Sequence, residues 1–234
     1  MRLGIVLALG GLALAAQAAA AQGACEDIAR IFKKPPKIGE WADIQMDRAK
    51  DEGKKPTMMR VGFVDQEQRG PDKLYRMQMI MTDHSGRRQI MQMLTPWGED
   101  AMTREYDSDI VMKMGDQPAM IMPIKGGRNQ PGMADLRREC TKYTIVGEES
   151  VTVPAGTYET RHYTGPEGDT WVAPDLPGWR LVKMVTKKGD TMVLTATGTG
   201  AKNEITETPM DMKAMMGRGK GKGLSKEEDD EEAK

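Results

Sequence analysis

The segment KLYRMQMIMTDHSGRRQIMQML, residues 73–94, determines the type of fold that we expect. Its first half places Tyr75 and three methionines at every second position, and its second half alternates again at Met91 and Met93. A period of two is the period of a β-strand, whose side chains point alternately to the two faces of a sheet. Residues 83–86, Asp-His-Ser-Gly, are turn formers. The segment therefore predicts a β-hairpin with a stripe of methionines on one face.

The same alternation recurs along the chain between turn signals. We expect strands near residues 39–48, 57–68, 107–113, 120–124, 143–146, 157–163, 170–173, 180–186 and 191–197. Turns are expected between them, including one at residues 147–150 that would end the strand beginning at 143. Short strands separated by glycine-containing turns are typical of antiparallel sheets. We therefore predict a mainly β protein with a single curved antiparallel sheet, an open and incomplete β-barrel.

Helices are expected at two places. Residues 24–34 carry Ile28, Ile31 and Phe32 at helical spacing, and two prolines follow at 35 and 36. Proline ends a helix because it lacks the backbone N–H donor. We predict a short N-terminal helix packed on the sheet, with one or two further short covering helices near residues 133–140.

Residues 1–21 have the layout of a secretory signal peptide. Arg2 precedes a short apolar run, and three alanines at 19–21 form a small-residue cleavage site. A membrane anchor is the alternative, but the apolar run of residues 3–16 is short for a span. We expect a periplasmic or secreted protein that has no stable membrane span after cleavage.

The chain has two cysteines, Cys25 and Cys140. In an oxidising compartment, two cysteines suggest one disulfide. The alternative is a lipid on Cys25, for which Ala24 is a suitable preceding residue, whereas Gln22 is unsuitable at the third position back. We predict the disulfide, which would exclude lipidation.

Composition separates the chain into a folded domain and a tail. Residues 22–207 are long enough for one domain with a real core. Residues 208–234 contain a glycine and lysine repeat and an acidic block, and such blocks cannot offset the entropy of ordering. The net charge of −1 gives no general attraction to nucleic acid. We expect a monomer with one domain and a disordered charged tail.

Catalytic and metal-binding signatures are absent from the sequence as we interpret it. His84 falls in a predicted turn and His162 on a predicted strand, and neither lies near the signature of a serine or cysteine nucleophile. There is no zinc-ligand spacing. We therefore expect no enzymatic activity, no cofactor and no metal.

Copper is the alternative that the methionines raise. Met-x-Met recurs at 77/79/81, 91/93, 112/114, 120/122 and 210/212, and thioethers are soft ligands that suit cuprous copper. Two such residues on one strand lie about 6.6–7 Å apart. Their sulfurs can hardly share an ion without a third sulfur from a neighbouring strand, so we prefer a purely apolar face.

Three segments resemble a known group of proteins. They are VTVPAGTYETRHY at 151–163, TWV at 170–172 and PGWRLVKM at 177–184. This part of the chain resembles exported bacterial domains of uncharacterised function grouped with the lipoprotein-localisation factors, the LolA/LolB-like carriers. The resemblance implies an open, incomplete β-barrel with helices over its mouth, enclosing an apolar cavity for acyl chains. This chain departs from that pattern by having methionines where such cavities are often aromatic.

The resemblance and the methionine stripe together suggest a function. We expect a non-enzymatic carrier for a lipid or a lipoprotein acyl chain, with an envelope protein as a further partner. The alternatives are an envelope-associated structural domain with a filled core, and a copper-binding protein. The predicted ligand-binding residues are Tyr75, Met77, Met79, Met81, Met91, Met93, Met112, Met114, Met120 and Met122.

Overall fold

The computed structural model describes residues 23–31, 33–51, 53–97, 109–122 and 140–211. These residues form a helix at 23–31, a short 3-10 helix η1 (Ala49–Asp51) and twelve strands. The strands are β1 (Trp41–Asp47), β2 (Thr57–Arg69), β3 (Asp72–Thr82), β4 (Arg88–Pro96), β5 (Ile110–Met114), β6 (Met120–Met122), β7 (Thr144–Val153), β8 (Gly156–Thr164), β9 (Gly168–Val172), β10 (Leu181–Thr186), β11 (Thr191–Gly198) and β12 (Met210–Asp211).

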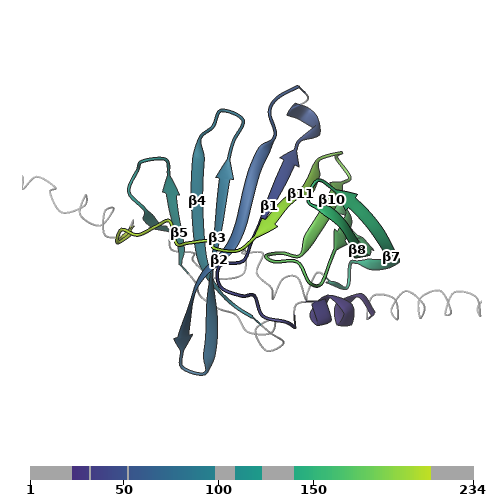
Figure 1. The fold of residues 1–234 in the computed structure, drawn as a ribbon, viewed down its shortest axis with the longest axis horizontal. Coiled ribbons are helices and arrows are strands. Elements are labelled where there is room, and N and C mark those ends of the chain that lie inside the picture. The colour runs from purple at the N-terminus through teal and green to yellow at the C-terminus, as the bar shows by residue number, and fades with distance from the viewer. Residues whose placement is uncertain (1–22, 32, 52, 98–108, 123–139, 212–234) are drawn as a thin grey trace, which may run out of the picture.

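All twelve strands belong to one sheet (Figure 1). The strand order is β12-β6-β5-β4-β3-β2-β1-β11-β10-β9-β8-β7, so two meanders meet where β1 pairs with β11. The two ends of this order, β12 and β7, are not paired with each other, and the sheet stays open. The predicted mainly β fold with one open curved sheet and an N-terminal helix is confirmed.

Three details differ from the prediction or fall outside what the structure describes. The expected turn at residues 147–150 is wrong, because β7 runs through it and turns at Pro154 and Ala155 instead. Gly147 instead marks a shift in the β7–β8 register, because an isolated glycine within a strand often accompanies a β-bulge rather than a turn. The signal peptide, and the short helices expected near 133–140 apart from residue 140, lie outside the described residues.

The main core lies on one face of the sheet, which we call the inner face. On β1 and β2 it is built from Ala42, Ile44, Val61 and Phe63, all at most 3% exposed. Leu194 of β11 and residues of the 173–182 segment pack into the same cluster. This burial fixes the register, because a slip of one residue would turn the apolar set outward.

The opposite, outer face of β2–β5 is covered by residues 199–209, which we call the strap. It leaves β11, crosses the sheet and delivers β12 to the edge strand β6 (Figure 1). The strap passes close to Gly62, where an added Cβ would lie 3.2 Å from the Cβ of Ala201. Ile205 packs with Ile80 and Ile90 in a small separate core. The β12–β6 pair is parallel, the exception in an otherwise antiparallel sheet, and it places Met210 in the sheet although we assigned it to the tail.

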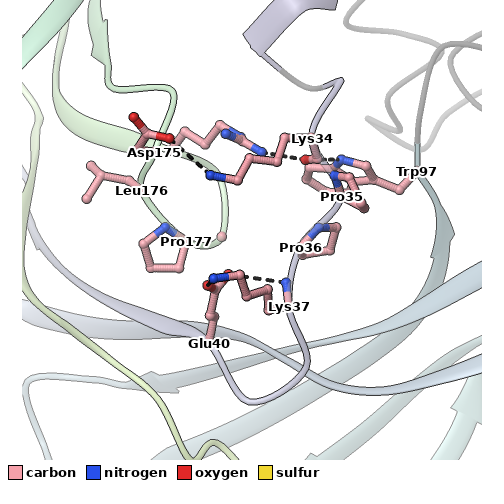
Figure 2. Close-up of a pocket in the computed structure, with 11 residues that line it drawn as sticks. Lys34, Pro35, Pro36, Lys37, Glu40, Trp97, Asp175, Leu176 and Pro177 are labelled. Atoms are coloured by element: carbon pink, nitrogen blue, oxygen red, sulfur yellow. Dashed lines mark hydrogen bonds and ion pairs between the residues drawn. The ribbon is translucent and has the colours of Figure 1, made fainter.

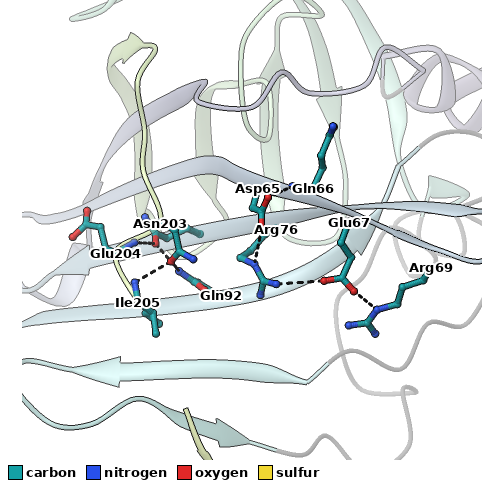
Figure 3. Close-up of polar contacts among 10 residues, drawn as sticks. Asp65, Gln66, Glu67, Arg69, Arg76, Gln92, Asn203, Glu204 and Ile205 are labelled. Atoms are coloured by element: carbon teal, nitrogen blue, oxygen red, sulfur yellow. Dashed lines mark hydrogen bonds and ion pairs between the residues drawn. The ribbon is translucent and has the colours of Figure 1, made fainter. Parts of the chain in front are cut away.

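Polar side chains hold the strap in place (Figure 3). Gln92 Nε2 donates to Gln78 Oε1 and to Asn203 Oδ1, both at 2.7 Å. Gln78 also accepts from the backbone N–H of Glu204 at 3.0 Å and donates to the carbonyl of Lys202 at 3.1 Å. Both glutamines are at most 3% exposed. Buried amides need such partners, so this network specifies where the strap lies.

The helix at 23–31 is anchored near β8. Cys25 and Cys140 form a disulfide, as predicted, with their Cα atoms 5.0 Å apart. The buried carboxylate of Asp27 accepts from the Tyr163 hydroxyl at 2.7 Å and pairs with Arg161 Nε at 2.8 Å. Burial raises the pKa of the Tyr163 hydroxyl most, and the hydrogen bond to the Asp27 carboxylate raises it further. Tyr163 therefore stays protonated and donates this hydrogen bond. No helix in the described part of the chain is long and apolar enough to cross a membrane.

Candidate functional site

A row of methionines crosses five neighbouring strands. Met79, Met91, Met112, Met120 and Met210 are successive cross-strand partners on β3, β4, β5, β6 and β12. Residues directly opposite in a sheet project to the same face. We call these five residues the methionine row.

The rows on either side extend the same surface. Met77 lies opposite Met93, Gln89 lies opposite both Met81 and Met114, and Met122 lies opposite Ile110. The structure therefore places all ten predicted residues on the inner face. We call the methionine row and these flanking methionines the methionine face. That its residues bind a ligand stays a prediction.

Exposure increases along this face from the core toward the sheet edge. Met77 and Met79 on β3 are 8% and 9% exposed. Met112 on β5 and the methionines of β4 and β6 are half-buried, and Met114 at the end of β5 is 48% exposed. On β4 the buried residues are Ile90, Gln92 and Leu94, which belong to the outer face under the strap. Beyond β3, solvent therefore reaches the methionine face more than the strap-covered face.

Aromatic side chains close one end of the methionine face. The ring of Phe63 meets the rings of Trp97 and Tyr75 edge to face, with centroids 5.4 Å and 6.4 Å apart. Trp97 follows β4, so this cluster lies just beyond Met93. Such contacts are rigid and well packed, and Tyr75, one of the ten predicted residues, is only 5% exposed.

A small cavity lies beside Trp97 (Figure 2). The carbonyl oxygen of Lys34 accepts from Trp97 Nε1 at 2.9 Å and from Arg180 Nη2 at 2.6 Å, which joins the segment after the helix to β4 and to the 174–180 loop. Burial lowers the pKa of the Arg180 guanidinium, although Asp175 and Glu40 oppose this effect. The cavity holds about 20 Å³, room for about one water.

A second cavity, of about 110 Å³, lies at the other end of the sheet between the loop after β1 and the turn after β3. Met46, Thr57 and His84 are among its lining residues. Ligand pockets for drug-sized molecules usually measure about 300–1,000 Å³. These two best-formed cavities of the described residues are too small for an acyl chain, and neither lies on the methionine face. The acyl-chain cavity that the resemblance implies therefore stays a prediction.

The other histidine, His162, belongs to a polar cluster on β7–β9. Its ring stacks on Trp171 with centroids 4.3 Å apart, and its two nitrogens lie 2.9 Å from a Glu149 oxygen and 3.2 Å from an Asp169 oxygen. Both ring nitrogens thus face carboxylates, which orient the ring. Among the described residues, no group of three His, Cys, Asp or Glu side chains could hold a metal ion.

Met210 is the member of the site that our sequence analysis did not assign. Its Met-x-Met spacing is visible in the sequence, but it lies in the segment that we interpreted as tail. Only the parallel pairing of β12 with β6, reached by the strap, brings it beside Met120.

Comparisons with known proteins give no family. No family model and no curated protein matches the chain. Among solved structures, it is similar to a protein of Bacteroides fragilis with a YmcC-like fold, at 14% identity and a TM-score of 0.40, over 72% of this chain and 99% of the other. It is also similar to a DUF1329 family protein from Desulfovibrio piger, at 13% identity and a TM-score of 0.32, over 82% and 95%.

A third similar structure is the MucA/MucB complex of Pseudomonas aeruginosa, at 13% identity and a TM-score of 0.35, over 78% of this chain and 58% of the other. The three TM-scores are all below 0.5. The similarities therefore assign neither a family nor a ligand, and the resemblance to the LolA/LolB-like carriers stays a prediction.

Proposed function

We propose that this protein is a non-enzymatic carrier that binds the apolar chain of a lipid on its methionine face, outside the cytoplasm. One observation supports this most: the methionine row crosses five strands and is increasingly exposed, while the strap covers the other face of three of them, β3–β5. A half-exposed apolar surface of this extent is typical of a binding site.

The chemistry of the surface suits a flexible chain. Methionine is unbranched and polarizable, and it adapts to ligands of variable shape. The row spans four inter-strand intervals of about 4.8 Å, which is roughly 19 Å in total. An extended long acyl chain has a comparable length. Burying a methylene contributes about 0.8 kcal/mol, so roughly ten buried methylenes would contribute about 8 kcal/mol, from which the cost of association is subtracted.

The disulfide is consistent with the proposed compartment. Disulfides such as Cys25–Cys140 persist in oxidising environments and are rare in the cytosol. Together with the predicted signal peptide, this suggests a periplasmic or secreted carrier. An envelope protein would then donate or receive the lipid.

A fluorescent apolar probe, N-phenyl-1-naphthylamine, tests the proposal by titration. We expect saturable binding, displacement by a long-chain fatty acid, and a loss of affinity in Met112→Asp, which places a charge in the middle of the row. Met58→Asp is the matched control, since Met58 is 36% exposed and its neighbour Met59 points to the inner face. Absence of saturable binding, or equal losses in the two variants, would contradict the proposal and favour a structural domain without a ligand.

A further inference from the structure

We propose that three members of the methionine row, Met91, Met112 and Met120, form a binding site for a cuprous ion. This inference does not rest on the proposed carrier function, because it concerns the sulfur atoms rather than the apolar character of the side chains. The two proposals share a surface and can fail separately.

The sheet register supplies the third sulfur that a single strand cannot. Met112 lies directly opposite Met91 on one side and Met120 on the other. Side chains directly opposite each other in a sheet have Cβ atoms about 4.5–5.5 Å apart, closer than the 6.6–7 Å between alternate residues of one strand. Methionine has three rotatable bonds, so three neighbouring thioethers can converge on one point.

The ligand set selects the ion. Thioethers are soft and neutral, and they bind Cu(I) in preference to hard cations, which require oxygen ligands. The neighbouring positions on this face carry Ile110, Gln89 and further methionines, so the rows beside the site provide no carboxylate. Gln89 Nε2 donates to the sulfur of Met112 at 3.3 Å, so this sulfur points toward the half-buried amide of Gln89.

Met112 and Met120 lie outside the main core. Both are half-buried, and neither belongs to a hydrophobic core cluster of the described residues. A second cross-strand row, Met46–Met192–Met184, has the same register geometry, but all three of its members pack against the main core, whereas only Met91 of the proposed site does. Packing holds the second row in place, so we assign the site to the first row alone.

The test is an anaerobic titration of the full chain with Cu(I) in competition with bathocuproine disulfonate. We expect one tightly bound ion, with a first shell of sulfur atoms in X-ray absorption spectra. The variant Met112→Leu/Met120→Leu should lose this ion. Leucine has a similar volume and is apolar, so the same variant should still fold.

The matched control is Met184→Leu/Met192→Leu, which also removes two cross-strand thioethers. This variant should keep the bound ion. The proposal is overturned if the wild-type chain binds no Cu(I) tightly, if Met112→Leu/Met120→Leu keeps the ion, or if the control loses it. None of these results would affect the carrier proposal, which the apolar probe tests separately.

Discussion

Truncating individual methionines to alanine along the methionine face should destabilise the protein in the order of their burial. Met79 is 9% exposed and lies between Val61 and Met91, so Met79→Ala removes a largely buried side chain from a packed site. Buried Met→Ala changes typically cost about 2–5 kcal/mol, the sum of lost transfer free energy and a cavity. That is a large fraction of the roughly 5–15 kcal/mol that stabilises a typical protein.

The same change nearer the edge should cost less. Met91 is half-buried, so Met91→Ala should cost about half as much as Met79→Ala. Met114 is 48% exposed, and Met114→Ala should change the free energy of unfolding by no more than about 0.5 kcal/mol. Urea unfolding monitored by tryptophan fluorescence measures all three, and a midpoint that moves without a change in slope reports stability alone.

Two results would refute this reasoning. If Met114→Ala costs as much as Met79→Ala, the edge of the face is packed and solvent does not reach it. If Met79→Ala costs less than about 1 kcal/mol, Met79 does not belong to the core, and our assignment of the inner face is wrong.

Three further predictions concern the elements around the site. Cys25→Ala/Cys140→Ala should lower the free energy of unfolding by about 2–5 kcal/mol in urea, since the disulfide spans 115 residues of sequence; an unchanged midpoint would contradict this. Asn203→Ala removes an acceptor of the buried Gln92 amide and should cost about 1–3 kcal/mol, whereas Lys202→Ala, whose backbone carbonyl makes the contact, should cost little. Hydrogen bonds from the Ser85 hydroxyl, and next from the Arg87 N–H groups, hold the pKa of Asp83 well below its ordinary 3.8. The ionised Asp83 therefore contributes its full stabilisation of the folded state above about pH 3.8, and this stabilisation is lost as the pH falls below that value. Asp83→Asn should therefore show a smaller loss of stability on acidification than the wild-type chain, in urea titrations at several pH values.

Strands and hairpins of this fold were predictable because side-chain alternation and turn residues are visible in a short stretch of sequence. Alternating side chains and the turn at 83–86 predict the β3–β4 hairpin, and alternation alone places its methionines on one face. The burial of Gln78 and Gln92 was not predictable, because polar residues that alternate with apolar ones normally face water. They are buried because the strap, more than a hundred residues later in the chain, crosses them.

In the candidate site, too, some features follow from local sequence and others depend on pairing with distant strands. Alternation predicts the face on which Met91 and Met112 lie, but not that they are direct partners, since register depends on pairing between strands. That partnership is what makes a three-sulfur site geometrically reasonable. Met210 joins the row only through a parallel pair, which requires a long connection and leaves no local signal.

Native mass spectrometry of protein freshly purified from its own compartment tests the carrier proposal most directly. We expect a population heavier than the bare chain by the mass of a lipid, which organic extraction releases and identifies. Met112→Asp should remove that population, and Met58→Asp should keep it. A wild-type spectrum that contains only the bare chain, and stays so after incubation with fatty acid or phospholipid, would contradict the proposal.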